Sequence, residues 1–342
     1  MKIVISSYAY YPSIGGLEEV TDLLAHEFVA RGHAVKILTM TSSPALDNLP
    51  FEVLRRPTPK ELIRAIGWAD IYLQQNISLR LGWPLLFVRR PWVVAQHGPL
   101  GEHGGLRGAK RLLKGMAIRF AHEVVACSRA VAQEIGQDVA VITNPYRDAQ
   151  FRLLYAGKRE CDLVFLGRLV SDKGAILLLE ALALLRGRGL TPSLAIIGAG
   201  PEEQLLRARC TALGLDDQVR FAGLIRGERL VEELNRCRIM VIPSVWEEPF
   251  GVVALEGIAC GCVVVAAQAG GLPEAIGPCG VTFPKGDVAA LVDRLGELLD
   301  DEGRIAALRV GALAHLERHR PSMVTETYLR ALERANRTST TR

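Results

Sequence analysis

The chain has 342 residues, of which 49% are hydrophobic and 23% are charged, and its formal net charge is +4. This composition is typical of a globular protein and excludes a disordered or low-complexity chain, while the length allows two domains, each with its own core. The longest apolar runs fall well short of the about 20 residues that a membrane-spanning helix needs, and no signal peptide is recognisable, so we expect a cytoplasmic protein.

The first half of the chain alternates short apolar segments with amphipathic ones. An amphipathic helix is predicted over residues 17–32, where Val20, Leu24 and Phe28 recur at helical spacing. Strands are predicted for residues 2–7, 33–39, 69–74, 91–97, 123–128 and 138–144. Strands that are this apolar, and that are separated by helices, indicate a parallel sheet covered on both faces.

The second half of the chain repeats this α/β pattern. After Asn144-Pro145 the pattern loosens, which predicts a domain boundary near residues 150–160. Strands are predicted for residues 161–167, 192–198, 218–223, 238–244, 262–267 and 279–283. Pro321 suits the first turn of a last helix over residues 321–336, and residues 336–342 are expected to fray. We therefore expect two doubly wound domains, over residues 1–152 and 153–318, followed by a C-terminal segment over 319–342.

Two loops of the second half carry candidate site residues. Arg168 and Lys173 lie between a strand and a helix, where they would form an anion site at the helix N-terminus; a solvated basic loop is the alternative. Gly198 and Gly200 occupy a similar position, but Glu203 replaces the third glycine of a dinucleotide-binding fingerprint. The pattern therefore argues against a redox cofactor.

The first half contributes a glycine pair and a histidine. Gly15 and Gly16 follow the first strand and would let backbone N–H groups approach a phosphate or a sugar, although a tight structural turn would use the same residues. His97 ends a predicted strand, so it would face the cleft where ligands bind in doubly wound sheets. A buried structural histidine is the alternative.

Three carboxylates bracket the apolar stretch SVWEEPFGVVALEG. Pro249 disfavours helical geometry at Glu248, so Glu248 is expected in the loop before a helix, and Glu256 within that helix. Two acceptor-only groups near a cleft suit the vicinal hydroxyls of a sugar. A general acid/base pair is the other possibility, because the distance between the two carboxylates cannot be read from their spacing.

Glu248-x7-Glu256, in the stretch EPFGVVALE, resembles the Glu-x7-Glu motif of the retaining glycosyltransferases of family 4, which have the GT-B fold. Further stretches are similar to the family's successive signatures, in the same order: PSIGGLEEVTDLLAHEFVARGHAV, GRLVSDKG, GAGPEEQL, VIPSVWEEPFG, EGIACG and GGLPEAI. The resemblance covers nearly the whole chain. It implies two Rossmann-like domains facing a cleft, with the acceptor on the N-terminal domain, the donor on the C-terminal domain, and the last helix crossing back to the N-terminal domain.

The resemblance also implies roles for individual residues. Arg168 and Lys173 match the pair that binds the donor's diphosphate and steadies the departing nucleotide. Glu256 matches the carboxylate that holds the ribose hydroxyls, and Glu248 matches the one that contacts the donor sugar. His97 resembles a histidine that lies against the transferred sugar. Catalysis would thus depend on His97, Arg168, Lys173 and Glu248.

Further donor contacts are implied for three glycine loops and for the start of the helix after Glu248. These contacts would come from Gly15, Gly16, Gly198, Phe250, Gly251, Gly270 and Gly271. The nucleobase is expected near Leu224 and Ile225. No cofactor and no metal are expected, because the sequence has no Asp-x-Asp pair and its seven cysteines form no Cys-x-x-Cys pair. We expect reduced cysteine thiols.

The sequence departs from the family pattern at two places. The family usually has alanine after the second glutamate, where this chain has Gly257, which would be a small packing change inside a helix. The family often has Asn-Gly-Val-Asp where this chain has NPYRD, at residues 144–148. That change lies at the domain junction and could alter the hinge geometry or the acceptor side.

Positive charge is concentrated in one segment of the first half. Residues 55–119 contain 12 Lys or Arg and three Asp or Glu. Arg107, Lys110, Arg111 and Lys114 are expected on one face of a helix, which suggests an anionic membrane surface, or a phosphorylated or lipid-pyrophosphate acceptor. A solvated helix with a buried apolar stripe is the alternative.

The sequence thus predicts a retaining, metal-independent transferase that moves a sugar from a nucleoside diphosphate sugar, UDP- or GDP-linked, to a hydroxyl acceptor. The acceptor would be a glycan, a lipid-linked molecule or a small molecule, with surface glycan, lipopolysaccharide or glycolipid assembly as the setting. We expect no nucleic-acid partner, and a cytoplasmic location that could be peripheral on the inner face of the membrane. A nucleotide-sugar epimerase of the same fold and a non-catalytic nucleotide-binding subunit are the alternatives.

Overall fold

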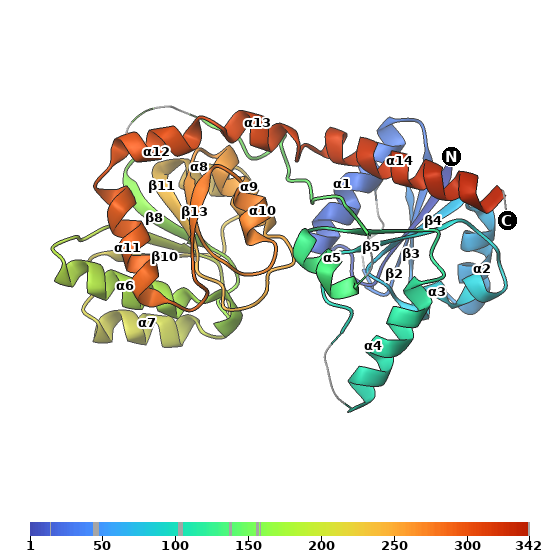
Figure 1. Ribbon diagram of the computed structural model, residues 1–342, viewed down its shortest axis with the longest axis horizontal. Helices are drawn as coiled ribbons and strands as arrows, with labels where there is room; N and C mark the ends of the chain where they lie inside the picture. The colour runs from blue at the N-terminus through green and yellow to red at the C-terminus, as the bar shows by residue number, and fades with distance from the viewer. Residues whose placement is uncertain are drawn as a thin grey trace. The chain divides into compact units, whose positions relative to one another are not determined.

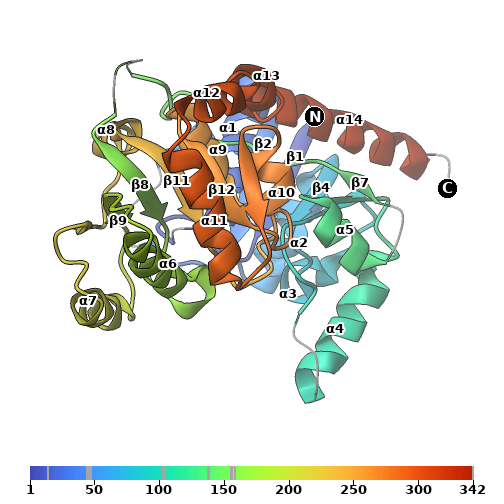
Figure 2. The same ribbon diagram turned by 60° about the vertical axis from the view of Figure 1, so that its left-hand side comes forward.

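The computed structural model describes residues 1–13, 15–43, 48–101, 105–136, 139–154, 157 and 159–340. The chain forms two compact units: the first comprises Met1–Pro145 with the C-terminal segment that begins at Arg320, and the second comprises Tyr146–His319. Each unit is an α/β structure built on its own parallel sheet (Figures 1 and 2). The predicted fold class, two doubly wound Rossmann-like domains, is therefore confirmed.

Within the described residues, the sheet of the first unit has seven strands in the order β3-β2-β1-β4-β5-β6-β7, and neighbouring strands are parallel. The strands are β1 (Lys2–Ser7), β2 (Ala34–Thr39), β3 (Glu52–Arg55), β4 (Ile71–Gln75), β5 (Trp92–Gln96), β6 (Glu123–Ala126) and β7 (Ala140–Val141). The helices are α1 (Gly16–Ala30), α2 (Pro59–Trp68), α3 (Leu79–Gly82), the 3-10 helix η1 (Trp83–Leu86), α4 (Gly105–Ile118), α5 (Arg129–Ile135) and α14 (Pro321–Thr340).

The sheet of the first unit buries both of its faces. Ile3 of β1 packs in one core with Phe28 of α1 and Tyr328 of α14. Val4, the next residue of β1, packs in a second core with Ile66 of α2. Because successive side chains of a strand point to opposite faces, a strand covered on both sides must be apolar throughout. Each such fully buried side chain contributes about 1.5–3 kcal/mol relative to an exposed one.

The C-terminal helix α14 packs on the first unit, beside α1 (Figure 1). It begins at Pro321, as the sequence predicts. Val324, Tyr328 and Leu332 recur at a spacing of four residues and are buried in the core with α1. The helix continues beyond residue 336 to Thr340, and the hydroxyl of Thr338 donates to the carbonyl of Arg334, so the fraying expected for residues 336–342 stays a prediction.

Within the described residues, the sheet of the second unit has six strands in the order β10-β9-β8-β11-β12-β13, again with parallel neighbours. The strands are β8 (Cys161–Leu166), β9 (Leu194–Ile197), β10 (Val219–Gly223), β11 (Cys237–Ile242), β12 (Val263–Ala267) and β13 (Gly280–Phe283). The helices are the 3-10 helix η2 (Ser171–Lys173), α6 (Ala175–Gly187), α7 (Glu203–Ala212), α8 (Glu228–Arg236), α9 (Val252–Ala259), α10 (Leu272–Ile276), α11 (Val288–Leu299), α12 (Glu302–Arg309) and α13 (Ala312–Glu317).

The junction between the units differs from the predicted boundary after residue 152. Residues 146–152 belong to the second unit, where the Tyr146 backbone N–H donates to the carbonyl of His319 (3.2 Å). The carbonyl of Arg152 accepts from the Asn235 side chain of α8 (3.0 Å). These contacts attach a segment that has no regular secondary structure and whose sequence therefore does not indicate its unit.

The sequence pattern also does not reveal β3, because Glu52 and Arg55 at its ends obscure the apolar pair between them. β7 occupies only Ala140–Val141 of a longer predicted strand. No helix among the described residues has the length and apolar character to cross a membrane.

Candidate active site

Loops from neighbouring strands of the second unit are bonded together beyond the carboxyl ends of the strands. The loop after β8 contacts the loop after β9, because the backbone N–H of Leu169 donates to the carbonyl of Ala199 (3.0 Å). It contacts the loop after β11 as well, because the N–H of Val245 donates to the carbonyl of Asp172 (3.0 Å). These are the loops in which the sequence predicts Arg168, Lys173, Gly198 and Glu248.

Two glycines allow these loops to approach closely. Gly174, at φ 68°, precedes α6, and a Cβ there would overlap the carbonyl oxygen of Pro243 in the loop after β11. Gly198, at φ 143°, lies so close to Gly167 that a Cβ would overlap that residue's carbonyl oxygen. Gly198, which suggests part of a dinucleotide-binding fingerprint in the sequence, is thus required here for contact between backbones. A role for Gly198 in binding a ligand stays a prediction.

Glu247 connects the loop after β11 to the loop after β12. Its Oε2 accepts from the backbone N–H of Gly270 (2.6 Å), and its Oε1 is paired with Lys285. The carbonyl of the next residue, Glu248, accepts from the N–H of Gly271 (2.7 Å). Of the two glycines predicted to contact the donor, Gly271 therefore holds the backbone of Glu248, and Gly270 binds the Glu247 side chain that connects the two loops.

Glu248 is a buried carboxylate with one occupied and one open oxygen. Its side chain is 11% exposed, and Oε1 accepts from Nζ of Lys173 (2.5 Å) and from Oγ of Ser244 (2.7 Å). Among the described residues, Oε2 has no hydrogen-bond partner and is not itself fully buried. Burying an ionised carboxylate is costly unless it is paired, and Lys173 and Ser244 supply that compensation. The open oxygen can accept from a hydroxyl group of a ligand.

The two basic residues of the loop after β8 differ in their surroundings. Lys173 is half-buried and paired with Glu248, whereas Arg168 is exposed and has no ion pair among the residues that the structure describes. Both precede the N-terminus of the 13-residue helix α6, whose dipole favours anions. The structure thus brings Lys173 and Glu248 together, and leaves the Arg168 guanidinium available to an anion.

The remaining predicted residues of the second unit lie on α9 and beyond β10. Glu256 is half-buried within α9, as predicted. Gly251 caps that helix at φ 104°. Phe250 is only 1% exposed and packs against His319, so its side chain is part of the core, and a contact of this residue with the donor stays a prediction. Leu224, predicted near the nucleobase, is 62% exposed beyond β10, and Ile225 is half-buried.

Gly257, the departure from the family pattern, has a structural explanation. A Cβ at this position of α9 would lie 2.6 Å from Sδ of Met240, a fully buried residue of β11. The methionine therefore occupies the space that an alanine methyl group would need.

His97 directly follows β5 in the first unit and is buried. Its backbone N–H donates to Oδ1 of Asn76 (2.6 Å). Ring atom Nδ1 lies 2.9 Å from Oδ1 of Asn144, and Nε2 lies 2.5 Å from Oε1 of Gln75. Burial lowers the pKa of His97 to about 4, although the contact with Asn144 opposes this. The imidazole is therefore neutral and has a single N–H to donate.

A neutral His97 requires one of the two amides to donate to it. Nε2 of Gln75 is buried without a hydrogen-bond partner, and a half-turn of this amide would let it donate to Nε2 of His97. Nδ1–H of His97 then donates to Asn144. Both ring nitrogens are engaged by buried amides, so the residue is suited to a fixed position and unsuited to proton transfer.

The glycine pair after β1 lies at the start of α1. Gly15 is the extended N-cap residue, and a Cβ there would lie 2.7 Å from Oε2 of Glu18, a buried carboxylate of the first helical turn. Gly16, the first residue of α1, has open space where a side chain would extend. Close approach of a ligand is therefore possible at Gly16, whereas a side chain at Gly15 would displace the carboxylate of Glu18.

The basic helix predicted around Lys110 is α4, which projects from its sheet in both views (Figures 1 and 2). Lys110 is exposed, Lys114 is half-buried, and Arg111 is directed to Glu134 of α5 (3.9 Å). The side chain of Arg107 lies outside the described residues. Among the described side chains of this helix, Ile118 is buried, whereas Leu112, Leu113 and Met116 are 45–66% exposed; Phe120, just beyond the helix, is 79% exposed.

Ser244 is the site residue that the sequence analysis did not identify. It is fully buried and donates to Glu248, but it lies in an apolar stretch with no motif of its own. Its position four residues before Glu248 is the signal that could have indicated it. All seven cysteines are free, and the described residues contain no group of three or more His, Cys, Asp or Glu that could hold a metal ion.

Two family models match the chain. The model described as Glycosyltransferase Family 4 matches residues 14–148, and the model described as Glycosyl transferases group 1 matches residues 148–312. The matches meet at residue 148, close to the junction of the two units.

Several known proteins match this chain over most of its length. An uncharacterized glycosyltransferase of Methanocaldococcus jannaschii is 27% identical over 325 residues, which are 81% of this chain and 83% of that protein. D-inositol 3-phosphate glycosyltransferase 1 of Catenulispora acidiphila is 26% identical over 344 residues, or 92% and 82% of the two chains. The crystal structure of Anabaena HepE in complex with UDP and glucose has a TM-score of 0.81 at 22% identity and covers 97% of this chain and 99% of its own. The fold is therefore that of the GT-B glycosyltransferases.

Proposed function

The chain belongs to the glycosyltransferases, with a family 4 domain in its first half and a group 1 domain in its second, and on that premise we propose that it transfers a sugar from a nucleoside diphosphate sugar to a hydroxyl group of an acceptor. The observation that carries the proposal is the cluster of Lys173, Ser244 and Glu248, next to the exposed Arg168. Two cations suit a diphosphate, and the open oxygen of Glu248 suits a sugar hydroxyl.

Arg168 and Lys173 would act on the leaving group. When the bond between the anomeric carbon and the phosphate oxygen breaks, the electron pair stays on that oxygen and negative charge grows on the diphosphate. Two fixed cations and the N-terminus of α6 stabilise this charge without having to reorganise. Removal of one such preorganised donor typically costs about 10²–10³ in rate. Lys173 keeps two further N–H donors when it is bonded to Glu248.

Glu248 would act on the sugar. Its open oxygen accepts from a sugar hydroxyl and opposes the positive charge that develops on the ring, and Glu256 holds the ribose. The ammonium group of Lys173 on Oε1 makes Glu248 a poor nucleophile, so we favour attack by the acceptor from the face of the leaving group, with its proton passing to the phosphate. This course retains the anomeric configuration. The ¹H coupling constant of the anomeric proton in the product reports that configuration and tests the retaining mechanism.

The donor is expected to carry UDP or GDP, with its base near Leu224 and Ile225. The Anabaena structure, with UDP and glucose bound, supports UDP as the first nucleotide to test. Because Arg168 and Lys173 supply the positive charge that a metal ion would otherwise provide, we expect activity to persist in EDTA. Loss of activity in EDTA, restored by a divalent cation, would contradict that part of the proposal.

The binding test is thermal stabilisation by nucleoside diphosphates and nucleotide sugars, measured in EDTA on the wild type and on Lys173→Ala. A ligand at a hundred times its Kd stabilises the protein by about 2.7 kcal/mol. We expect one nucleotide series to raise Tm and the increase to shrink in the variant. Lys285→Ala is the matched control, because Lys285 also pairs with a glutamate, Glu247. Equal shifts in the wild type and Lys173→Ala would argue against the diphosphate site.

Two alternatives use the same residues. A nucleotide-sugar epimerase would convert the donor with no acceptor present, and a non-catalytic subunit would bind a nucleotide without turnover. Release of the nucleoside diphosphate that depends on an added acceptor separates the proposed transferase from both.

Association with an anionic membrane is the second part of the proposal, and α4 carries it. Lys110 and Lys114 lie among the exposed apolar residues Leu112, Met116 and Phe120. Helices that combine basic and exposed apolar side chains bind at the surface of anionic bilayers. Such association would suit a lipid-linked acceptor and the assembly of a surface glycan, a lipopolysaccharide or a glycolipid.

Sedimentation with vesicles of phosphatidylglycerol and phosphatidylcholine tests the membrane proposal. We expect the wild type to sediment with the vesicles at low salt. The double variant Lys110→Glu and Lys114→Glu should stay in solution, because each basic residue near the surface contributes about 1 kcal/mol to membrane binding. The control is Lys60→Glu, an exposed lysine on α2. Equal sedimentation of all three proteins would refute the role of α4.

A further inference from the structure

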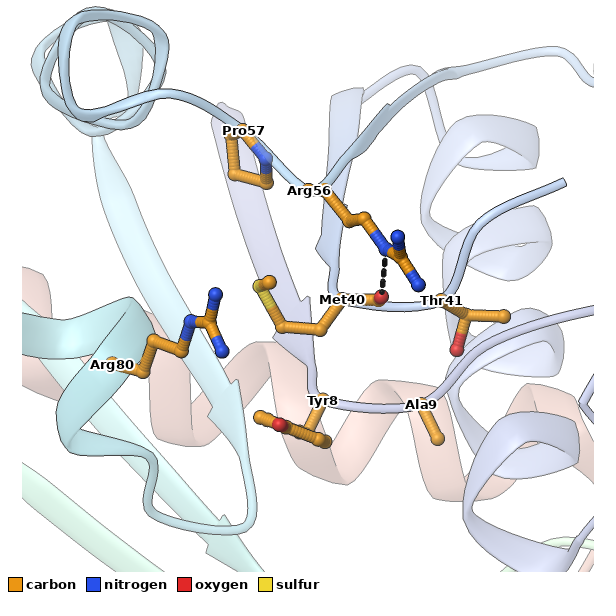
Figure 3. A pocket seen from close by; sticks show the side chains of 7 residues that line it. All are labelled: Tyr8, Ala9, Met40, Thr41, Arg56, Pro57 and Arg80. Carbon is orange, nitrogen blue, oxygen red and sulfur yellow. Dashed lines mark hydrogen bonds between the residues drawn. The ribbon is translucent and has the colours of Figure 1, made fainter.

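A pocket of about 340 Å³ lies at the carboxyl edge of the sheet in the first unit, and no residue predicted from the sequence lines it. Figure 3 shows the side chains that line it, which are Tyr8, Ala9, Met40, Thr41, Arg56, Pro57 and Arg80. This volume is at the lower end of the about 300–1,000 Å³ of small-molecule sites, so it suits a fragment the size of one sugar ring or a head group.

The topology of the sheet favours a ligand at this place. β1 pairs with β2 on one side and with β4 on the other, so the chain order reverses between β1 and β4. Tyr8 follows β1 directly, and Arg80 lies on α3, which follows β4. In doubly wound sheets, ligands bind outside the carboxyl ends of the strands at such a reversal. The pocket thus has the position of a binding site in its own unit.

Two guanidinium groups enter the pocket from opposite sides of Met40 (Figure 3). Arg56 donates from Nε to the carbonyl of Met40 (3.2 Å), which leaves its terminal nitrogens for another partner. Arg80 is exposed, and among the described residues neither arginine is paired with a carboxylate. Two like charges repel each other, and an anion that lies between them offsets this repulsion. Guanidinium groups bind phosphate through paired N–H donors.

The backbone of Arg56 is held in an uncommon conformation. Its φ is 48°, in the left-handed region that residues other than glycine and asparagine rarely adopt. The bond from its N–H to the carbonyl of Thr39 (2.7 Å) holds the residue there. Strained backbone is found preferentially at functional sites. An arginine at this position, immediately before Pro57, indicates that its side chain is needed in the pocket.

The other lining residues offer contacts for a polyhydroxylated ligand. Tyr8 is 53% exposed and presents its ring and hydroxyl group to the pocket (Figure 3). Oγ1 of Thr41 accepts from the backbone N–H of Tyr10 (3.1 Å), so its own O–H can donate to a ligand. An aromatic ring beside hydroxyl groups and cations can cover the apolar face of a sugar or cyclitol while its polar substituents are bonded.

We propose that Arg56 and Arg80 bind the phosphate group of a phosphorylated, polyhydroxylated acceptor. A phosphomonoester carries a charge of about −1.5 to −2 at pH 7, which matches the two guanidinium groups. That the ligand is the acceptor rests on the proposed transferase function. The phosphate site itself rests on the pocket and its charges, whether the phosphate belongs to a soluble molecule or to a lipid head group.

Isothermal titration calorimetry at low salt tests the site with inorganic phosphate and with the pair glucose 6-phosphate and glucose. We expect the wild type to bind phosphate and to bind glucose 6-phosphate more tightly than glucose. Arg56→Gln and Arg80→Gln should each weaken binding of both phosphate ligands by about tenfold or more, because each removes a charge-assisted contact. The control is Arg64→Gln, an exposed arginine of α2 outside the pocket, which should bind as the wild type does.

Absence of phosphate binding by the wild type, or equal losses in all three variants, would overturn the proposal. Sedimentation with vesicles that contain phosphatidylinositol 4-phosphate, whose head group carries a phosphomonoester, identifies the source of the phosphate. If Arg56→Gln and Arg80→Gln sediment less with these vesicles than the wild type does, the phosphate belongs to a lipid head group. If their sedimentation is unchanged while they bind glucose 6-phosphate more weakly, the phosphate belongs to a soluble acceptor. Either result supports the phosphate site. Nucleotide binding measured on the same variants should be unchanged, so a failed donor test and a failed phosphate test can be told apart.

Discussion

Acid should destabilise the first unit through His97. The ring is buried between the amides of Asn144 and Gln75, and burial lowers its pKa from the ordinary 6.5 to about 4. In the unfolded chain the same ring takes up a proton near pH 6.5. Between these two pH values the unfolded state binds one more proton than the folded state, so the stability that the neutral ring contributes is complete above pH 6.5 and is lost as the pH falls towards 4.

The size of this effect follows from the two pKa values. The interval between 6.5 and about 4, at about 1.4 kcal/mol for each pH unit, corresponds to roughly 3 kcal/mol of unfolding free energy. That is a substantial part of the about 5–15 kcal/mol of a typical domain. Carboxylates titrate in the same range, so the contribution of His97 is obtained as the difference between the wild type and His97→Gln.

Urea unfolding at several pH values, followed by the fluorescence of the tryptophans of the first unit, measures this difference. We expect the stability of the wild type relative to His97→Gln to fall by roughly 3 kcal/mol between pH 7 and pH 4. The ¹⁵N shifts of the ring should remain those of a neutral imidazole at pH 5.5. A ring that titrates near 6.5, or a difference independent of pH, would refute the reasoning.

Two contacts of the second unit give further predictions. Gly257→Ala should destabilise the protein by about 1 kcal/mol, because overpacking against Met240 exceeds the gain in helix propensity. Met240→Val should relieve that cost in the double variant, and additive effects of the two substitutions in the double-mutant cycle would contradict this. Gly174→Ala should cost about 2–4 kcal/mol, because it adds an overlap with the carbonyl of Pro243 to the strain of a positive φ. Gly189→Ala, at φ 84° with open space around it, should cost only the backbone strain, and thermal unfolding that gives equal values for the two would contradict the packing argument.

The parallel sheets could be predicted from the sequence because strands covered on both faces leave a nearly continuous apolar run. β1 and β8 are of this kind. β3 could not be predicted, since at the edge of its sheet Glu52 and Arg55 need not be buried. The extension of α14 beyond residue 336 could not be predicted for a related reason, because its helicity depends on packing of α14 against α1 and not on the propensity of those residues.

The candidate site could be predicted where a charged residue lies in the loop that follows an apolar strand, as Lys173 does after β8 and Glu248 after β11. The roles of Glu247 and Glu248 could not be separated, because adjacent residues in a loop give no indication of which one faces Lys285 and which faces Lys173. Arg56 and Arg80 escaped prediction because they lie on different elements and meet only through the order of the strands.

The release of nucleoside diphosphate in the presence of donor and acceptor tests the central claim most directly, when Glu248→Gln is compared with Glu247→Gln. The two residues are adjacent, and only Glu248 has an open oxygen next to Lys173. We predict that Glu248→Gln lowers kcat by about 10²-fold or more, while Glu247→Gln, which alters only the contact between two loops, keeps most of the activity. Full activity of Glu248→Gln would contradict the assignment of the active site.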